Sequence, residues 1–309
     1  MHKRFKKIIK RTFLVVILLG FICIHFLVPR ILTEKRNSLT EALRGKKDTV
    51  NYFKTIDTSK YKQKKLSIPS YDGLALSSLL TYTNTHSVKG TIILVHSSGS
   101  TKYSFLELSD LLARNGFNAI AIDLRAFGES EGRYSTYSVK EKKDIQSIIN
   151  YLIKHEKLNT FGIWGKSLGG AVALQAMGLD KRIEFGIIES TFTDFKTNMD
   201  TYFTRVTGLE LKPFTNYLTN RAGTIGDFDA DDASPIRYCE RITQPILVVH
   251  GTNDIVFKLK YGKANFDKIP SKKKAFIKID NAGHTNIWNV GGETYFNSVL
   301  EFMNNATVN

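Results

Sequence analysis

The sequence predicts an α/β fold in which a mostly parallel sheet has helices on both of its faces. From residue 90 onward, short apolar runs alternate with segments of helical period, and this alternation is typical of sheets built from strand–helix–strand units. The runs at 90–96 and 118–124 are largely apolar. Strands of a parallel sheet have this composition because helices cover them on both faces.

The expected elements follow one another in a simple order. Two strands flank a turn signal at residues 71–73 and predict an antiparallel hairpin. A strand, a tight turn and a helix are expected within residues 160–174. The other expected strands cover residues 65–69, 74–83, 90–96, 118–124, 185–189, 245–250 and 275–280, and the expected helices cover 104–115, 139–155, 258–269 and 293–303.

Residues 193–232 interrupt this alternation. The segment is too long for an ordinary connection and carries its own aromatic side chains, so we expect a small helical cap. Phe203 and Phe214 belong to this segment. Two roles are open for them: they contact an apolar substrate, or they form the small core of the cap itself.

The N-terminal segment has the features of an uncleaved signal-anchor. Residues 13–29 are apolar apart from His25, which is near the shortest length that spans a bilayer. No small-residue cleavage site follows, so a cleaved signal is the less favoured alternative. Six basic residues and no acidic residue precede the apolar run. This predicts a single-pass protein of the cell membrane, with its folded domain on the non-cytoplasmic side.

Three parts are therefore expected along the chain: an anchor at residues 1–33, a basic stalk at 34–63, and a folded domain at 64–309 that includes the cap. The formal net charge is +15, from 44 basic and 29 acidic residues. Much of the basic excess flanks the apolar run, where it suits anionic lipid head groups. No basic patch interleaved with aromatic residues is evident, which argues against a nucleic-acid partner.

The cysteines and histidines do not suggest a metal centre. Cys23 lies in the apolar run and Cys239 in the folded domain, so no disulfide is expected within the domain. No spacing of Cys and His residues is typical of a metal site. We expect neither a metal nor another cofactor.

The turn within residues 160–174 carries the motif Gly165-x-Ser167-x-Gly169. A motif this short also arises by chance, but an apolar strand before it and an alanine-rich helix after it are the setting of a nucleophile elbow. In that setting the serine hydroxyl projects from the edge of the sheet. The amides at the start of the following helix carry partial positive charge toward an oxyanion that forms nearby.

A serine nucleophile needs a base, and the base needs an acid to orient it. His284 follows the expected strand at 275–280, at the sheet edge where ligands bind. Asp254 follows the strand at 245–250, and Asp280 is the alternative acid. The order Ser167, Asp254, His284 is the order of the catalytic residues in α/β-hydrolases. His96 and His250 end strands, and for both we expect structural hydrogen bonds.

Two backbone amides are expected to bind the oxyanion. One is the amide of Leu168, directly after the nucleophile, and the other belongs to the loop after the strand at 90–96. Within that loop we choose Ser98 by its position, and the alternative is that the loop is an ordinary turn of small residues.

Five short pieces of the chain match a known superfamily: His96-Ser-Ser-Gly99, Asp123-Leu-Arg-Ala-Phe-Gly-Glu-Ser130, Gly165-Lys-Ser-Leu-Gly169, His250-Gly-Thr-Asn-Asp254 and Gly283-His284. With these pieces residues 70–303 resemble the α/β-hydrolases, and most closely the serine aminopeptidase and monoglyceride-lipase-like branch. The resemblance implies hydrolysis of esters or amides without a cofactor. Two positions depart from that branch, because Ser97 and Ala126 stand where glycine is usual. We expect Asp123 and Arg125 to be structural.

The sequence thus predicts a membrane-anchored serine hydrolase that cleaves a small-molecule carboxylic ester, with amides and thioesters as further substrates. The basic anchor and the aromatic cap favour an apolar substrate. Two alternatives remain: an amide hydrolase of the peptidase or aminopeptidase kind, and a binding protein that has the fold without activity.

Overall fold

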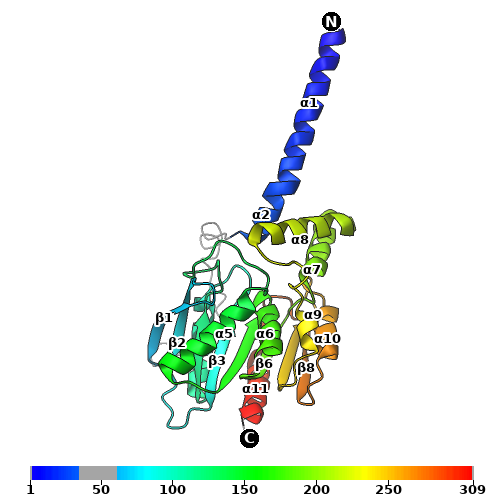
Figure 1. Ribbon diagram of the computed structural model, residues 1–309. Coiled ribbons are helices and arrows are strands. Elements are labelled where there is room, and N and C mark those ends of the chain that lie inside the picture. Colours follow the sequence, from blue (N-terminus) through cyan, green and yellow to red (C-terminus); the bar gives the residue numbers. More distant parts are fainter. Residues whose placement is uncertain (1, 35–60, 308–309) are drawn as a thin grey trace.

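The computed structural model describes residues 2–34 and 61–307. A long N-terminal helix stands out from an α/β domain, and two helices of the cap lie between them (Figure 1). Most of the expected stalk, residues 35–60, falls outside the described residues.

The domain is organised around one sheet of eight strands in the order β1-β2-β4-β3-β5-β6-β7-β8. β1 pairs antiparallel with β2, and β2 pairs antiparallel with β4, whereas every pair from β4 to β8 is parallel. The expected hairpin and the mostly parallel sheet are therefore confirmed. The strands are β1 (Gln63–Pro69), β2 (Ala75–Thr81), β3 (Gly90–Val95), β4 (Phe117–Ile122), β5 (Phe161–Lys166), β6 (Ile183–Glu189), β7 (Ile246–Gly251) and β8 (Lys274–Ile279).

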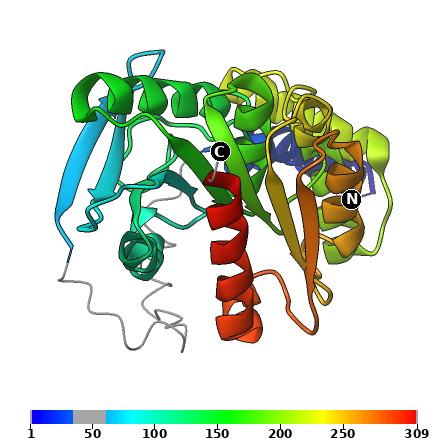
Figure 2. The same ribbon diagram turned by 90° about the horizontal axis from the view of Figure 1, so that it is seen from below.

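Helices cover both faces of the sheet, as Figure 2 shows from below. One face packs on α5, α6 and α10, and the other packs on α4 and α11. Each face has its own apolar core, because the strands send alternate side chains to opposite sides. The covering helices are α4 (Leu106–Arg114), α5 (Glu141–Tyr151), α6 (Leu168–Leu179), α9 (Pro235–Cys239), α10 (Leu259–Lys268) and α11 (Ile287–Thr307).

The largest departure from the expected elements is at the last helix, which we expected at 293–303. Helix α11 begins at Ile287 and contains a break at Gly292, where φ is 51° and ψ is −145°. Only glycine adopts such angles readily. The turn before the break places Ile287 and Trp288 in the core of one face.

The cap between β6 and β7 is built mainly from α7 (Phe195–Thr207) and α8 (Lys212–Gly226). It has a small core of its own around Phe195, Ala222 and Ala230. The ring of Tyr137, from the segment before α5, stacks on Phe195 with 3.8 Å between the ring centroids. The cap is thus fixed to the domain on the side where β6 ends.

The N-terminal helix consists of α1 (His2–Ile22), a π-helical turn η1 (Cys23–Leu27) and α2 (Val28–Thr33). Among the described residues, the stretch Arg4–Thr33 alone is long and apolar enough to cross a membrane, and a signal sequence has the same properties. α2 lies at the lower end of α1 in Figure 1 and packs against α8 of the cap. The division of the chain at residue 33 stays a prediction.

Candidate active site

The turn between β5 and α6 holds Ser167 in a strained conformation. β5 ends at Lys166, α6 begins at Leu168, and Ser167 between them has φ of 55° and ψ of −114°. A residue with a β-carbon adopts a positive φ only when its surroundings enforce it. This is the geometry expected of a nucleophile elbow.

The two glycines of the motif are needed because backbone lies against both. A β-carbon on Gly165 would come within 2.2 Å of the carbonyl oxygen of Gly169. A β-carbon on Gly169 would come within 2.0 Å of the carbonyl oxygen of Val95. The start of α6 therefore rests directly on the ends of β5 and β3.

Two hydrogen bonds connect the serine turn to the end of β6 and the residues that follow it. The amide of Ser167 donates to the carbonyl oxygen of Glu189 at the end of β6, at 2.8 Å. The hydroxyl of Thr191 donates to the carbonyl oxygen of Ser167, also at 2.8 Å. Neighbouring elements thus fix the strained residue in place.

The structure brings Ser167, His284 and Asp254 together in a chain of hydrogen bonds. His284 Nε2 lies 2.9 Å from Ser167 Oγ, and His284 Nδ1 lies 2.8 Å from Asp254 Oδ2. The side chain of His284 is 14% exposed and that of Asp254 is fully buried. The three residues come from the carboxyl ends of β5, β7 and β8, where sheets of this class bind ligands.

Asp254 is held as a carboxylate. Its Oδ1 accepts hydrogen bonds from the amides of Val256 and Phe257, each at 2.8 Å. Burial disfavours the charge, but hydrogen bonds from His250, His284 and the Phe257 amide outweigh it and hold the pKa of Asp254 below its ordinary value. A carboxylate only accepts hydrogen bonds, so Nδ1 of His284 carries the proton toward it.

The proton on Nδ1 leaves the Nε2 lone pair of His284 free to accept the hydroxyl proton of Ser167. The ring of Phe257 meets His284 edge-on, with 4.9 Å between centroids, and limits how the imidazole can tilt. Asp280, the alternative acid, is exposed just after β8, and the acid that bonds His284 is Asp254. The arrangement can move a proton from a serine hydroxyl to an imidazole.

The two amides expected to bind an oxyanion lie on neighbouring segments. Leu168 is the first residue of α6, and Ser98 lies in the turn that follows β3. The close approach of Gly169 to the end of β3 brings these segments side by side. The oxyanion-binding role of Ser98 and Leu168 stays a prediction.

A buried acid next to the site was not singled out from the sequence. Glu189 ends β6 and is 1% exposed. Its Oε1 accepts hydrogen bonds from the indoles of Trp164 and Trp288, at 2.5 and 2.9 Å, and from the hydroxyl of Tyr295, at 2.6 Å. The sequence signal was a single acid at the end of the apolar strand expected at 185–189.

Lys166, the residue before the serine, joins this cluster. Its ammonium lies 3.5 Å from the ring centroid of Trp288 and 4.0 Å from Glu189 Oε2. Burial lowers the pKa of the Lys166 ammonium, and the charge of Glu189 opposes that shift. Trp288 lies in the first turn of α11, the helix that follows the His284 loop, so this cluster connects the serine turn to the histidine loop.

The remaining polar residues of the matching pieces make structural contacts. His96 Nε2 accepts from the amide of Leu124 at 3.1 Å, and His250 Nε2 lies 2.7 Å from the carbonyl oxygen of Phe257. Asp123 pairs with the buried Lys102, and Arg125 pairs with Asp144. Within residues 2–34 and 61–307, His, Cys, Asp and Glu side chains form no group of three that could hold a metal ion.

The strand order and the serine turn after β5 define the class of protein, and comparisons with known proteins agree with it. Residues 86–224 match the family model described as "Serine aminopeptidase, S33". The chain therefore has the α/β-hydrolase fold, and residues 86–224 are similar to the serine aminopeptidase family.

The individual relatives are distant in sequence and similar in fold. The chain is 24% identical to the protein YqkD of Bacillus subtilis over 71% of its own length and 73% of the relative. It is 26% identical to the "Alpha/beta hydrolase domain-containing protein WAV2" of Arabidopsis thaliana, over 60% of each chain. The solved structure of the Pyrococcus furiosus esterase Pf2001 superimposes with a TM-score of 0.67 at 21% identity, and covers 81% of this chain and 92% of that one.

Proposed function

We propose that this protein is a membrane-anchored serine hydrolase that cleaves carboxylic esters through an acyl-enzyme. The hydrogen-bonded chain from Ser167 through His284 to Asp254 is the observation that carries the proposal. The match of residues 86–224 to a hydrolase family model supports hydrolysis in general, and the likeness in fold to an esterase favours esters.

In the first half of the reaction, Ser167 Oγ attacks the carbonyl carbon of the ester. His284 Nε2 takes the hydroxyl proton as the new C–O bond forms. The tetrahedral intermediate then collapses, the bond to the alcohol breaks, and the alcohol leaves with the proton from His284. The acyl group remains on Ser167 Oγ.

In the second half, water attacks the acyl carbon while His284 takes its proton. The second intermediate releases the carboxylic acid and returns the proton to Ser167. Asp254 holds the imidazole in the required tautomer and stabilises the imidazolium that forms in each half. The amides of Ser98 and Leu168 would bind the oxyanion of both intermediates.

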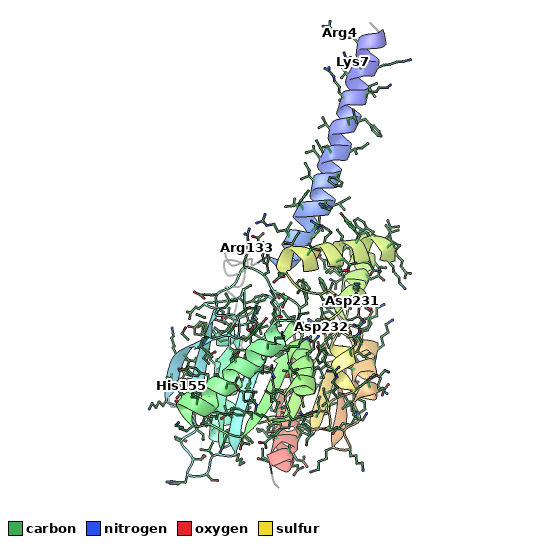
Figure 3. The ribbon with its side chains drawn as sticks, in the orientation of Figure 1. Arg4, Lys7, Arg133, His155, Asp231 and Asp232 are labelled. Carbon is green, nitrogen blue, oxygen red and sulfur yellow. The ribbon has the colours of Figure 1, made fainter. Side chains whose placement is uncertain are left out.

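The anchor is the second part of the proposal. We infer that α1 spans a bilayer with its N-terminus in the cytoplasm, so that the domain lies on the non-cytoplasmic side. The 30-residue stretch Arg4–Thr33 has a mean hydropathy of 2.6 in its most apolar window. Basic side chains, among them Arg4 and Lys7, lie at the free end of the helix (Figure 3), as the positive-inside rule requires.

A series of p-nitrophenyl esters of increasing acyl length tests the proposal with the full-length protein in detergent. Saturable hydrolysis that is lost in Ser167→Ala is expected. Aminoacyl-p-nitroanilides offered alongside distinguish a preference for amides. A folded protein that cleaves neither class and is not labelled by a fluorophosphonate would contradict the proposal and favour a binding protein.

A further inference from the structure

A group of exposed apolar side chains lies on α7, on α8 and on the connection between these two cap helices. Val206 is 65% exposed and Leu209 is 56% exposed, which is high for aliphatic side chains on one short stretch. We name this group the cap-tip patch. It consists of Tyr202, Val206, Leu209, Leu211 and Tyr217.

The patch is continuous with the foot of the N-terminal helix. α8 runs crosswise to α1 just below it (Figure 1), and α2 packs along α8. His25 Nδ1 is hydrogen-bonded to the hydroxyl of Tyr217, and the guanidinium of Arg221 donates to the carbonyl oxygen of His25 at 3.5 Å. One member of the patch is therefore in direct contact with the N-terminal helix.

Further contacts join the foot of the N-terminal helix to residues 133–137, the segment whose Tyr137 stacks on Phe195 of the cap. The hydroxyl of Tyr137 donates to the carbonyl oxygen of Leu32 at 2.6 Å. The hydroxyl of Thr33 donates to the carbonyl oxygen of Ser135, also at 2.6 Å. Arg133, near the foot of α1 (Figure 3), pairs with Glu34 at 2.8 Å. The N-terminal helix and the cap thus meet in a defined orientation.

This orientation determines where a bilayer surface would lie. A hydrocarbon core of about 30 Å takes up about 20 helical residues at about 1.5 Å each. The apolar run 13–29 ends within α2, so it fills that length only if the core reaches α2. α8 contacts the chain at His25 and along α2, so it lies where the hydrocarbon core meets the lipid head groups. Tyrosine is enriched at that level.

We propose that the cap-tip patch lies in the bilayer surface, so that the cap is a second membrane contact beside α1. Leu209, Leu211 and Val206 would enter the upper acyl-chain region. Arg205 and Lys212, which flank the connection between α7 and α8, would reach anionic head groups. The inference rests on the proposed anchoring by α1, but not on the proposed chemistry of Ser167.

Single fluorescent labels in the full-length protein test this contact. The background is Cys23→Ala, because the other cysteine, Cys239, is buried. Three variants, Leu209→Cys, Leu18→Cys and Val88→Cys, each receive an environment-sensitive dye. Val88 precedes β3, at the sheet edge opposite the cap, and is exposed, so it serves as the control site.

Each labelled protein is placed in nanodiscs of phosphatidylcholine and phosphatidylglycerol that hold one copy. Lipids with a nitroxide near the head group or deep in the acyl chain quench the dye by contact. We expect deep quenching at residue 18, shallow quenching at residue 209 and neither at residue 88. Adding Leu211→Asp should reduce quenching at 209 several-fold, whereas an added Lys89→Asp near the control site should not.

The outcomes distinguish the anchoring of the protein by α1 from the membrane contact of the cap. Quenching at 18 without quenching at 209 would overturn the cap contact and leave the anchor in place. No quenching at either site would overturn both. A dye at 209 that is shielded from water but not quenched by lipid would show that protein covers the patch, and this result also contradicts the proposal. Thermal unfolding of each variant confirms that it is folded.

Discussion

The indole N–H of Trp288 donates to the buried carboxylate of Glu189 at 2.9 Å, and through this contact helix α11 is joined to the end of β6. The carbonyl oxygen of the same glutamate accepts the amide of Ser167, whereas Trp288 follows the His284 loop by a few residues. Glu189 therefore helps to position both the proposed nucleophile and the proposed base.

Replacing Glu189→Gln should destabilise the fold and reduce kcat more than it changes KM. In glutamine an NH2 group that cannot accept replaces one oxygen and would face the indole N–H of Trp288. The remaining oxygen is an uncharged, weaker acceptor for the buried donors, so part of this hydrogen bonding would be lost. Such a loss costs about 1–3 kcal/mol. Urea unfolding and ester kinetics measure the two effects. Glu184→Gln on the same strand is exposed and is the matched control. Equal stability of the two variants would contradict this role.

The lowered pKa of Asp254 predicts an acid dependence of stability. Its pKa in the folded state lies below the ordinary value of 3.8, so its charged form stabilises the fold above about that pH. This contribution is lost as the pH falls through the folded-state pKa. Asp254→Asn should therefore lose less stability than the wild type between pH 5 and pH 3. Urea unfolding at each pH checks this, with Asp280→Asn as the control. Equal losses in wild type and Asp254→Asn would refute it.

Phe203 and Phe214 pack on each other, with 5.4 Å between ring centroids, and both are half-buried. If they also contact substrate, Phe203→Ala and Phe214→Ala should change the ratio of kcat/KM for long and short acyl esters, while the Tm barely moves. If they only form the core of the cap, the Tm of each variant should fall, because burying one such ring stabilises the fold by about 1.5–3 kcal/mol. A lower Tm with an unchanged chain-length preference would remove the support for an apolar substrate.

Two N-terminal deletions should differ in stability. Removal of residues 1–22 keeps η1 and α2 with their contacts to α8, whereas removal of 1–33 deletes the partners of Tyr137, Ser135 and Tyr217. Both proteins should be active, because the site lies beyond residue 95, but the shorter deletion should have the higher Tm. Differential scanning fluorimetry compares them. Equal Tm values would mean that α2 adds nothing to the stability of the domain.

The sheet could be predicted from the sequence because buried parallel strands are uniformly apolar and their order follows from short crossovers. Ser167, Asp254 and His284 could be brought together in advance because each follows such a strand. The early start of α11 could not be predicted. The break at Gly292 looks like a helix boundary in the sequence, and only the packing of Trp288 shows that the preceding turn is helical.

The Glu189 cluster and the contact between α2 and α8 escaped prediction for a different reason. Trp288 lies 99 residues from Glu189 along the chain, and Tyr217 lies 192 residues from His25. No local period connects residues so far apart. These contacts depend on the tertiary packing of helices and strands, whereas the period of apolar residues predicts only the helices and strands themselves.

Fluorophosphonate labelling of the full-length protein, followed by mapping of the adduct, tests the central claim most directly. We expect a single adduct on Ser167. We also expect that Ser167→Ala loses labelling and about 10⁴-fold or more of kcat/KM, because nucleophile and base act as a unit. Ser104→Ala, which changes an exposed serine, should behave as wild type. An adduct on another residue, or undiminished ester hydrolysis by purified and folded Ser167→Ala, would contradict the assignment of Ser167 as the nucleophile.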